Sequence, residues 1–246
     1  MRALTAAELL SVWENGSGLS APRRALLLLA AACPETPPAE LARLSIGQRD
    51  DLLLQLRAAA FGPRLEATAA CPQCAEKLEM IFDTADIRSP AAETKNPAAT
   101  LTLEFGGHAL TARVPDSLDL IEITNSPDLA QAESALLRRC VISARSGERQ
   151  VAADELPAPV ITALAERLAE ADPQADLRLA LACPACEHRW EESFDIVAFF
   201  WREIEAWSLR LLREVHTLAS TYGWSEAEVV ALSPTRRRLY LEMATS

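Results

Sequence analysis

Four of the six cysteines form two Cys-Pro-x-Cys units, Cys71 to Cys74 and Cys183 to Cys186. A Cys-x-x-Cys turn between two strands can direct both thiolates at one ion about 2.3 Å away, while amides of the turn hydrogen-bond the sulfurs. Two such turns complete a tetrahedron of sulfurs, in which zinc keeps no open coordination position. The sequence therefore predicts a structural Zn²⁺ held by Cys71, Cys74, Cys183 and Cys186, and no hydrolytic site.

Three other interpretations of these cysteines remain open. A redox dithiol prefers a Cys-x-x-Cys at a helix N-terminus, where the dipole lowers the thiolate pKa, whereas strand-like residues flank both pairs here. Four cysteines could instead hold an iron–sulfur cluster, or the site could bind nothing. Zinc knuckles often place glycine directly after the second cysteine, where a left-handed backbone is common. This chain has Ala75 and Glu187 at those positions.

Other reactive groups are sparse. The chain has no Gly-rich phosphate loop, no Gly-x-Ser-x-Gly elbow and no His-Glu-x-x-His motif. His188 follows Cys186 by two positions, but the matching position of the first unit is Glu76, so we expect a surface residue of a strand. His108 and His216 are isolated, and Cys33 and Cys140 lie in apolar segments typical of small buried thiols. The sequence predicts no catalytic residue and a protein that is not an enzyme.

The elements that must position the cysteines are two short hairpins. A strand from Leu65 to Ala69 precedes the first pair and one from Lys77 to Phe82 follows it, and the second pair lies within the corresponding stretch from Leu177 to Phe194. At one constant offset the helix before each hairpin and the hairpin itself align without gaps, as Leu56 with Leu168 and Glu79 with Glu191. We infer a duplicated helix and zinc-knuckle hairpin that share one four-cysteine site.

Helix signals dominate the remaining chain. Thr5 is expected to cap a helix ending near Trp13, Ser20-Pro22 to start another reaching Cys33, and Gly62-Pro63 to stop a third at Phe61. Between the hairpins, Gly106-Gly107 predicts a tight turn within a hairpin over 101–114. Asp116 and Ser126-Pro127 are then expected to open two helices, the second reaching about Arg139, and 159–171 to form another. The segment 89–100 is the best candidate linker.

Together these patterns predict an α+β fold that is mainly α-helical with short β-hairpins. We divide the chain into an N-terminal helical region (1–63), a first zinc-knuckle hairpin (64–88), an inserted hairpin with helices (100–175), a second zinc-knuckle hairpin (176–195) and C-terminal helices (196–246).

The C-terminal region is unusually aromatic. Four of the five tryptophans and both tyrosines lie there or just before it. Trp201 and Trp207 fall on nearly opposite sides of one predicted helix, which a single core could hardly bury together. We therefore predict that Trp201, Trp207, Tyr222 and Trp224 contribute to a partner-binding surface. Gly223 is expected to end the long helix, and Ser225 with Glu228 to form a capping box.

The net charge and the hydropathy of the chain indicate which classes of partner it does not bind. A formal net charge of −11 disfavours binding to a phosphate backbone, which depends on releasing counterions to a dense basic face. Arg236-Arg237-Arg238 is typical of a solvated helix face. The longest apolar run, from Ala25 to Cys33, is too short to span a membrane, and the start lacks an apolar stretch behind a basic end. We expect no nucleic-acid partner, no membrane insertion and a cytoplasmic protein.

Several short segments resemble a known family. They are Leu44-Ser45-Ile46-Gly47-Gln48-Arg49-Asp50, Arg113-Val114-Pro115-Asp116-Ser117-Leu118-Asp119-Leu120, the Cys-Pro-x-Cys pairs and Tyr222-Gly223-Trp224-Ser225-Glu226-Ala227-Glu228. The resemblance is to a family found among phage-tail and contractile-injection genes and related to the T-even-type baseplate hub assembly chaperones.

This resemblance implies a non-enzymatic role, as an assembly chaperone or a structural component, in building a baseplate or tail hub. The implied partners are tail proteins of a bacterial cytoplasm, and the protein could end up in a phage-like particle. Two other functions remain open from the residues themselves: a zinc-stabilised adaptor for an unrelated bacterial complex, and a thiol oxidoreductase that uses the two Cys-Pro-x-Cys pairs.

Overall fold

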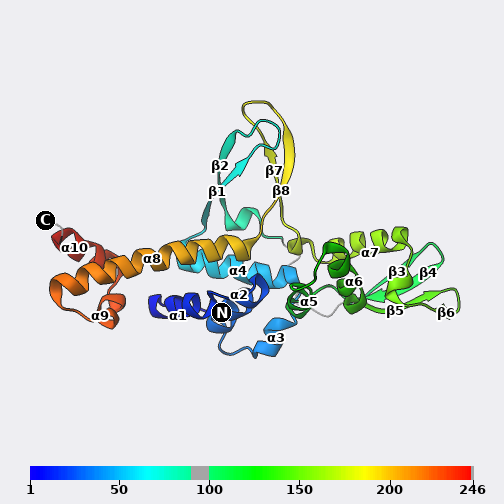
Figure 1. Cartoon of the computed structure of the whole chain (residues 1–246), viewed down its shortest axis with the longest axis horizontal. Helices are drawn as coiled ribbons and strands as arrows, with labels where there is room; N and C mark the ends of the chain where they lie inside the picture. The colour runs from blue at the N-terminus through cyan, green and yellow to red at the C-terminus, as the bar shows by residue number, and fades with distance from the viewer. Residues whose placement is uncertain (90–99, 245–246) are drawn as a thin grey trace.

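The computed structural model describes residues 1–89 and 100–244, so most of the candidate linker lies outside the described residues. Figure 1 shows a long helical bar with a pair of hairpins standing upright on it and a small sheet at one end. The predicted α+β, mainly helical fold class is confirmed. Within residues 1–89 and 100–244, no helix combines the length and the apolarity needed to cross a membrane.

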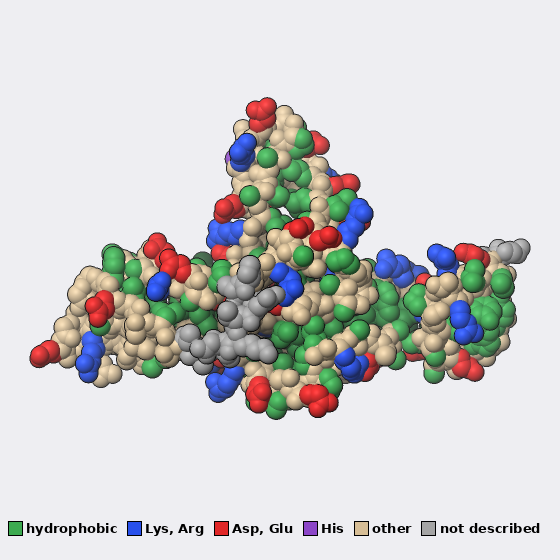
Figure 2. Space-filling view, turned by 180° about the vertical axis from the view of Figure 1, so that it is seen from behind, with side chains coloured by type: hydrophobic (Ala, Val, Ile, Leu, Met, Phe, Trp, Pro, Cys, Tyr) green, Lys and Arg blue, Asp and Glu red, His purple; other side chains and the backbone are tan. Residues whose placement is uncertain are grey.

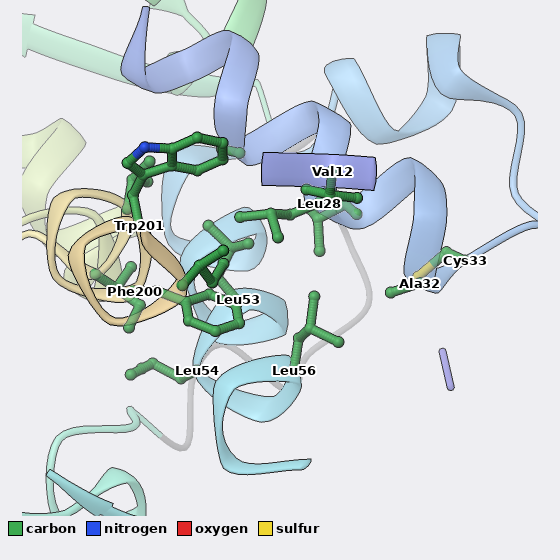
Figure 3. Close-up of a cluster of buried hydrophobic side chains, with 14 of the residues drawn as sticks. Val12, Leu28, Ala32, Cys33, Leu53, Leu54, Leu56, Phe200 and Trp201 are labelled. Atoms are coloured by element: carbon green, nitrogen blue, oxygen red, sulfur yellow. The ribbon is translucent and has the colours of Figure 1, made fainter. Parts of the chain in front are cut away.

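The middle of the bar is a helical core. Its helices are α1 (Ala6–Gly16), α2 (Ala21–Ala32), α3 (Pro38–Ala42), α4 (Ile46–Phe61) and the first half of α8 (Ile196–Tyr222). Leu28, Leu53 and Phe200 are fully buried where α2, α4 and α8 meet, as the close-up in Figure 3 shows. This cluster joins a helix from near the start of the chain to one that begins near its last quarter.

Local signals set the helix starts. Thr5 and Ser45 each accept a hydrogen bond from the third residue of the helix in a reciprocal capping box. The helix α1 runs on to Gly16, beyond the expected end at Trp13. A Cβ at Gly16 would lie 2.2 Å from the Trp201 ring, so this glycine allows α1 to approach α8 closely.

The end of the bar beyond α5 (Ser117–Ile123) is a four-stranded antiparallel sheet in the order β3-β4-β5-β6. The strands are β3 (Leu101–Phe105), β4 (His108–Ala112), β5 (Val141–Ser146) and β6 (Arg149–Gln150), and α6 (Leu129–Cys140) and α7 (Ala158–Ala171) accompany them. Leu110, Ala144 and Leu164 centre a second small core between the sheet and α7.

Two expectations for this region are corrected. The sequence predicted one hairpin, but β5 and β6 extend it to four strands. The helix α6 is capped by Asp128, whose side chain accepts from the amide of Gln131, and not by Ser126. Aspartate is one of the strongest N-cap residues. The preceding Ser126-Pro127 is also a typical helix start, so the sequence alone favoured the wrong cap.

The C-terminal half of α8 carries a third cluster around Leu211, Leu218 and Val229, completed by α9 (Glu226–Ala231) and α10 (Pro234–Ala244). Gly223 ends α8 with a φ of +72°, and Ser225 and Glu228 form the predicted capping box. At 27 residues, α8 is about 40 Å long. It runs from the helical core to the far end of the bar (Figure 1).

Candidate metal centre

Two antiparallel hairpins stand side by side on the helical core (Figure 1). One pairs β1 (Arg64–Ala70) with β2 (Lys77–Asp83), and the other pairs β7 (Arg178–Ala182) with β8 (Arg189–Ser193). We call this pair the hairpin tower. Along β1, β2 and β7, buried or half-buried residues alternate with exposed ones, and in β8 only Trp190 is half-buried. Apolar side chains therefore gather on one face of each hairpin.

The two turns at the tip of the tower have the same backbone geometry. The amide of Cys71 donates to the carbonyl of Glu76 at 2.8 Å, and that of Cys183 to the carbonyl of His188 at 2.8 Å. Within each turn, the amide of Ala75 donates to Cys71 and that of Glu187 to Cys183. Ala75 and Glu187 have φ of +61° and +58°, the left-handed region that glycine usually occupies.

The turns bring all four predicted ligands together. The sulfurs of Cys71 and Cys186 lie 3.7 Å apart, those of Cys74 and Cys183 lie 3.5 Å apart, and all four fall within 4.8 Å of one another. A zinc–sulfur tetrahedron with bonds of about 2.3 Å has edges of about 3.8 Å. The 3.5 and 3.7 Å separations also exceed a disulfide bond, which is about 2.05 Å. Four cysteines in this arrangement can hold one metal ion.

The pKa values of three of the clustered thiols shift, and not all in the same direction. Burial opposes ionisation of Cys71, but hydrogen bonds from the amides of Cys74 and Gln73 outweigh it and lower its pKa to about 7. The amide of Glu76 acts to lower the pKa of Cys74, yet the neighbouring thiol of Cys186 and burial raise it to about 12. The amide of His188 acts to lower the pKa of Cys186, but burial and the thiols of Cys183 and Cys71 raise it. Four thiolates this close need a cation to balance their charge.

Side chains at the base fix the tower to the helical core. Arg57 of α4 donates to the carbonyls of Gly62 and Arg64 at 2.8 and 2.6 Å, and its guanidinium pairs with Glu203 of α8 at 2.6 Å. Phe82 and Phe194, at the ends of the two hairpins, meet edge to face with centroids 5.8 Å apart. The tip geometry therefore depends on a base clamped by α4 and α8.

The expectation that His188 is a surface residue of a strand is wrong, because it lies just before β8. It is half-buried, and its ring stacks on Trp190 of β8 with centroids 5.9 Å apart. Cys33 and Cys140 are buried away from the cluster, as expected for small apolar residues, and burial raises the pKa of Cys140 to about 12.

The four predicted partner-binding residues lie in different environments. Trp201 is 4 % exposed and belongs to the helical core, where Arg24 covers its ring at 4.5 Å. Trp207 and Trp224 are half-buried, and Tyr222 is 37 % exposed. Tyr222, Trp224 and Tyr240 form one aromatic group at the end of α8. A partner-binding role stays a prediction, and of the four side chains Tyr222 offers the most accessible surface.

Sequence reasoning missed a polar junction that joins the inserted region to the helical core. The amide of Ile46, at the start of α4, donates to the carbonyl of Pro115 at 3.2 Å, and Ser45 bridges Asp116. The amide of Gly47 donates to the Asp172 carboxylate at 2.9 Å, where a Cβ would lie 2.0 Å from an oxygen. Through the first of these contacts, two segments that carry the family resemblance, 44–50 and 113–120, meet in space.

Asp119 lies at the centre of this junction. Its fully buried carboxylate accepts from Arg113 at 2.6 Å, from Arg139 at 2.7 Å and from the amide of Asp116 at 2.9 Å. Burial alone would raise its pKa, but these partners outweigh burial and lower it. A signal was present in the sequence, because an acidic residue three positions after an N-cap Asp is typical of a capping box.

Comparison with known proteins adds one match. A family model described as T4 bacteriophage base plate protein matches residues 23–201. This stretch contains all four clustered cysteines and ends in the first turns of α8, so Trp207, Tyr222 and Trp224 lie outside it. No curated protein and no solved structure matches the chain.

Proposed function

Because the chain belongs to the T4 bacteriophage base plate protein family, we propose that it is a non-enzymatic protein used in building the baseplate of a phage-like tail or contractile injection system. We further propose that one structural Zn²⁺, bound by Cys71, Cys74, Cys183 and Cys186, closes the tip of the hairpin tower. The observation that carries the metal assignment is the separation of the sulfurs, with all four within 4.8 Å of one another.

The zinc assignment rests on ligand chemistry. Soft thiolates favour zinc or an iron–sulfur cluster over hard cations. An iron–sulfur cluster of two or four irons needs sulfurs spread around the cluster, whereas sulfurs 3.5 and 3.7 Å apart match the edges of a single-ion tetrahedron, about 3.8 Å. Such an ion has no open position, so its contribution would be to stability and not to catalysis.

The more specific role that we propose for the protein is in assembly of the baseplate. We propose that the protein acts in the bacterial cytoplasm as an assembly chaperone or as a subunit that stays in the particle, with baseplate or tail-hub proteins as partners. A projecting tower and a long helix with an aromatic end present two separate surfaces, which suits a protein that holds other subunits in place. Tyr222 and Trp224 are the residues proposed to contact a partner at the aromatic end.

Co-expression tests this function. The tagged chain would be produced with the baseplate and tail-hub proteins encoded in the same gene cluster, and the complex isolated and identified by mass spectrometry. Recovery of at least one of these proteins in a stable ratio is expected. If none is recovered with intact, metal-loaded protein, the baseplate role is wrong and an adaptor for another complex becomes the better interpretation.

Metal analysis separates structural from redox use of the cysteines. We expect about one equivalent of zinc per chain and no change in zinc content on cycling with mild oxidant. A metal-free protein in which Cys71 and Cys74 interconvert between dithiol and disulfide would favour the thiol oxidoreductase instead.

A further inference from the structure

The hairpin tower has four strand edges. Each hairpin is a two-stranded sheet, so among the described residues β1, β2, β7 and β8 each have one neighbour and one outer edge. An unpaired edge invites another strand, and proteins usually protect it with charged side chains. Two edges carry charge near the tip: β2 has Lys77 and Glu79, and β8 has Arg189 and Glu191. The charges of β1, Arg64 and Glu66, lie only at its base, and the exposed Thr68 and Ala70 follow them.

The edge of β7, like that of β1, carries its charge only at the base. After Arg178, which pairs with Asp176 at 2.9 Å and Glu191 at 3.6 Å, the residues facing outward are Ala180 and Ala182. Neither alanine supplies a charge or bulk that would oppose the approach of another backbone. With Ala180 where β1 has Thr68, the β7 edge near the tip is the least obstructed of the four.

The hairpin register directs the backbone groups of these alanines outward. Cys183 donates to His188 and Phe194 donates to Leu177, which fixes the hydrogen-bonded rungs at both ends of the hairpin. Because hydrogen-bonded and non-hydrogen-bonded rungs alternate in an antiparallel pair, the rungs of Ala180 with Glu191 and Ala182 with Arg189 are of the second kind. Their N–H and C=O groups point away from β8 and towards the free edge.

A hollow with apolar and charged lining residues borders this edge. A cavity of about 480 Å³ is lined by the whole stretch 177–181, by Met80 and Phe82 of β2, and by 86–89. Since every residue of that stretch lines it, the hollow meets the edge of β7 and not only one face. Figure 2 shows hydrophobic side chains gathered between the two hairpins of the upright projection.

We propose that the outer edge of β7 binds an extended segment of a partner protein as an added strand. Backbone donors and acceptors on Ala180 and Ala182 specify an extended backbone. The apolar part of the hollow, at Met80 and Phe82, favours apolar side chains at every second position of the partner. A second copy of β7 fits less well, because its Leu179 and Leu181 already pack within its own tower. The proposal rests on the proposed function in taking a baseplate protein as the partner.

The substitution Ala180→Pro tests the edge directly. Proline removes the outward N–H of residue 180 but leaves the hydrogen bonds between β7 and β8 in place, since this rung has none, and proline is tolerated at strand edges. Thr68→Pro is the matched control. Thr68 pairs with Glu79 in the corresponding rung of β1, so the same change there leaves the β7 edge intact.

The measurements use the full chain and the baseplate proteins recovered with it. We expect hydrogen–deuterium exchange at the amides of Ala180 and Ala182 to slow at least about tenfold in the complex, and Ala180→Pro to weaken binding about tenfold or more, whereas Thr68→Pro stays within about twofold of the wild type. Thermal melting of both variants reports folding, and the exchange measurement on the wild type stands even where a variant is unstable.

The outcomes are separable. If the wild type binds a baseplate protein without protecting Ala180 and Ala182, or if both proline variants bind as the wild type does, the β7 proposal is wrong and the proposed function stands. Binding to no baseplate protein rejects both. Protection that appears in the isolated chain and rises with its concentration would identify self-pairing, and would overturn the assignment of the edge to a different protein.

Discussion

The sulfurs of Cys74 and Cys183 lie 3.5 Å apart, although the two cysteines are 109 positions apart in the chain. Closing a loop of this length costs little more than closing a shorter one, because the entropy grows only with the logarithm of length. The metal proposed at this point would act as a cross-link between two hairpins that share no hydrogen-bonded strand. Stability and metal binding should therefore be coupled.

Cys183→Ser is predicted to abolish zinc binding and to destabilise the protein. We expect metal content to fall from about one equivalent to near zero, and the free energy of unfolding to fall by about 2–5 kcal/mol, as when another cross-link is lost. Cys140→Ala is the control, since Cys140 is buried outside the cluster. Full metal content in the Cys183→Ser variant would contradict the four-cysteine site.

Glycine at the left-handed turn positions is predicted to stabilise the tower. Ala75 and Glu187 have a positive φ, which strains a residue with a Cβ but not glycine. Ala75→Gly and Glu187→Gly should therefore each raise the free energy of unfolding by about 0.5–1 kcal/mol. Thermal melting of the metal-loaded variants measures this. The exposed strand change Thr68→Gly, which has no such conflict to relieve, is expected to destabilise.

Much of the fold could be predicted because its signals are local. Thr5, Asp116 and Ser225 act as the expected helix caps, and each is a short polar residue directly before its helix. The four cysteines could be grouped because their chemistry requires a common ion. The relation between the two hairpins as copies of one unit stays a prediction, as do the boundaries of the five regions.

What could not be predicted depends on contacts between distant segments. The strands β5 and β6 have mixed polarity, and only pairing with β4 makes them strands. The place of Trp201 in the core follows from Gly16, which gives room for its ring. The Asp119 junction needs Arg139 from another helix. Single-chain periodicity carries no information on such partners.

Asp119→Asn is predicted to destabilise the inserted region. The neutral amide loses charge-assisted hydrogen bonds to Arg113 and Arg139, so we expect a loss of about 2–3 kcal/mol, measured by denaturant unfolding at pH 7. Asp154→Asn is a matched control, because Asp154 pairs with the neighbouring Arg138 at an exposed site and should cost less than about 1 kcal/mol. Equal effects of the two changes would contradict a structural role for the junction.

The Asp119 junction also has a pH signature. Because the folded-state pKa of Asp119 lies below its unfolded value, its contribution is present above the unfolded pKa and is lost as the pH falls through the folded one. The difference in stability between the wild type and Asp119→Asn should therefore narrow in acid. A difference that stays constant down to pH 3 would contradict this interpretation.

Asp50→Asn is predicted to stabilise the protein at neutral pH, in the opposite sense to Asp119→Asn. Burial raises the pKa of Asp50 to about 6, against the attraction of Arg49 and with help from Asp195 and Asp172. Because the pKa of Asp50 is higher in the folded than in the unfolded state, ionisation of its carboxyl destabilises the folded protein as the pH rises from about 4 to about 6. The asparagine cannot charge, and its oxygen can still accept from Arg49, so a gain of about 2–3 kcal/mol is expected at pH 7.

The pH dependence separates this effect from a simple packing change. At pH 5 the advantage of Asp50→Asn should shrink to about half, because the folded wild type is then mostly protonated. Paired unfolding curves at pH 5 and 7 cancel any shared effect of metal loss, and Glu79→Gln on the exposed side of β2 is the surface control. A variant that is less stable than the wild type at pH 7 would show that the Asp50 carboxylate, held 2.7 Å from Arg49, is a favourable ion pair after all.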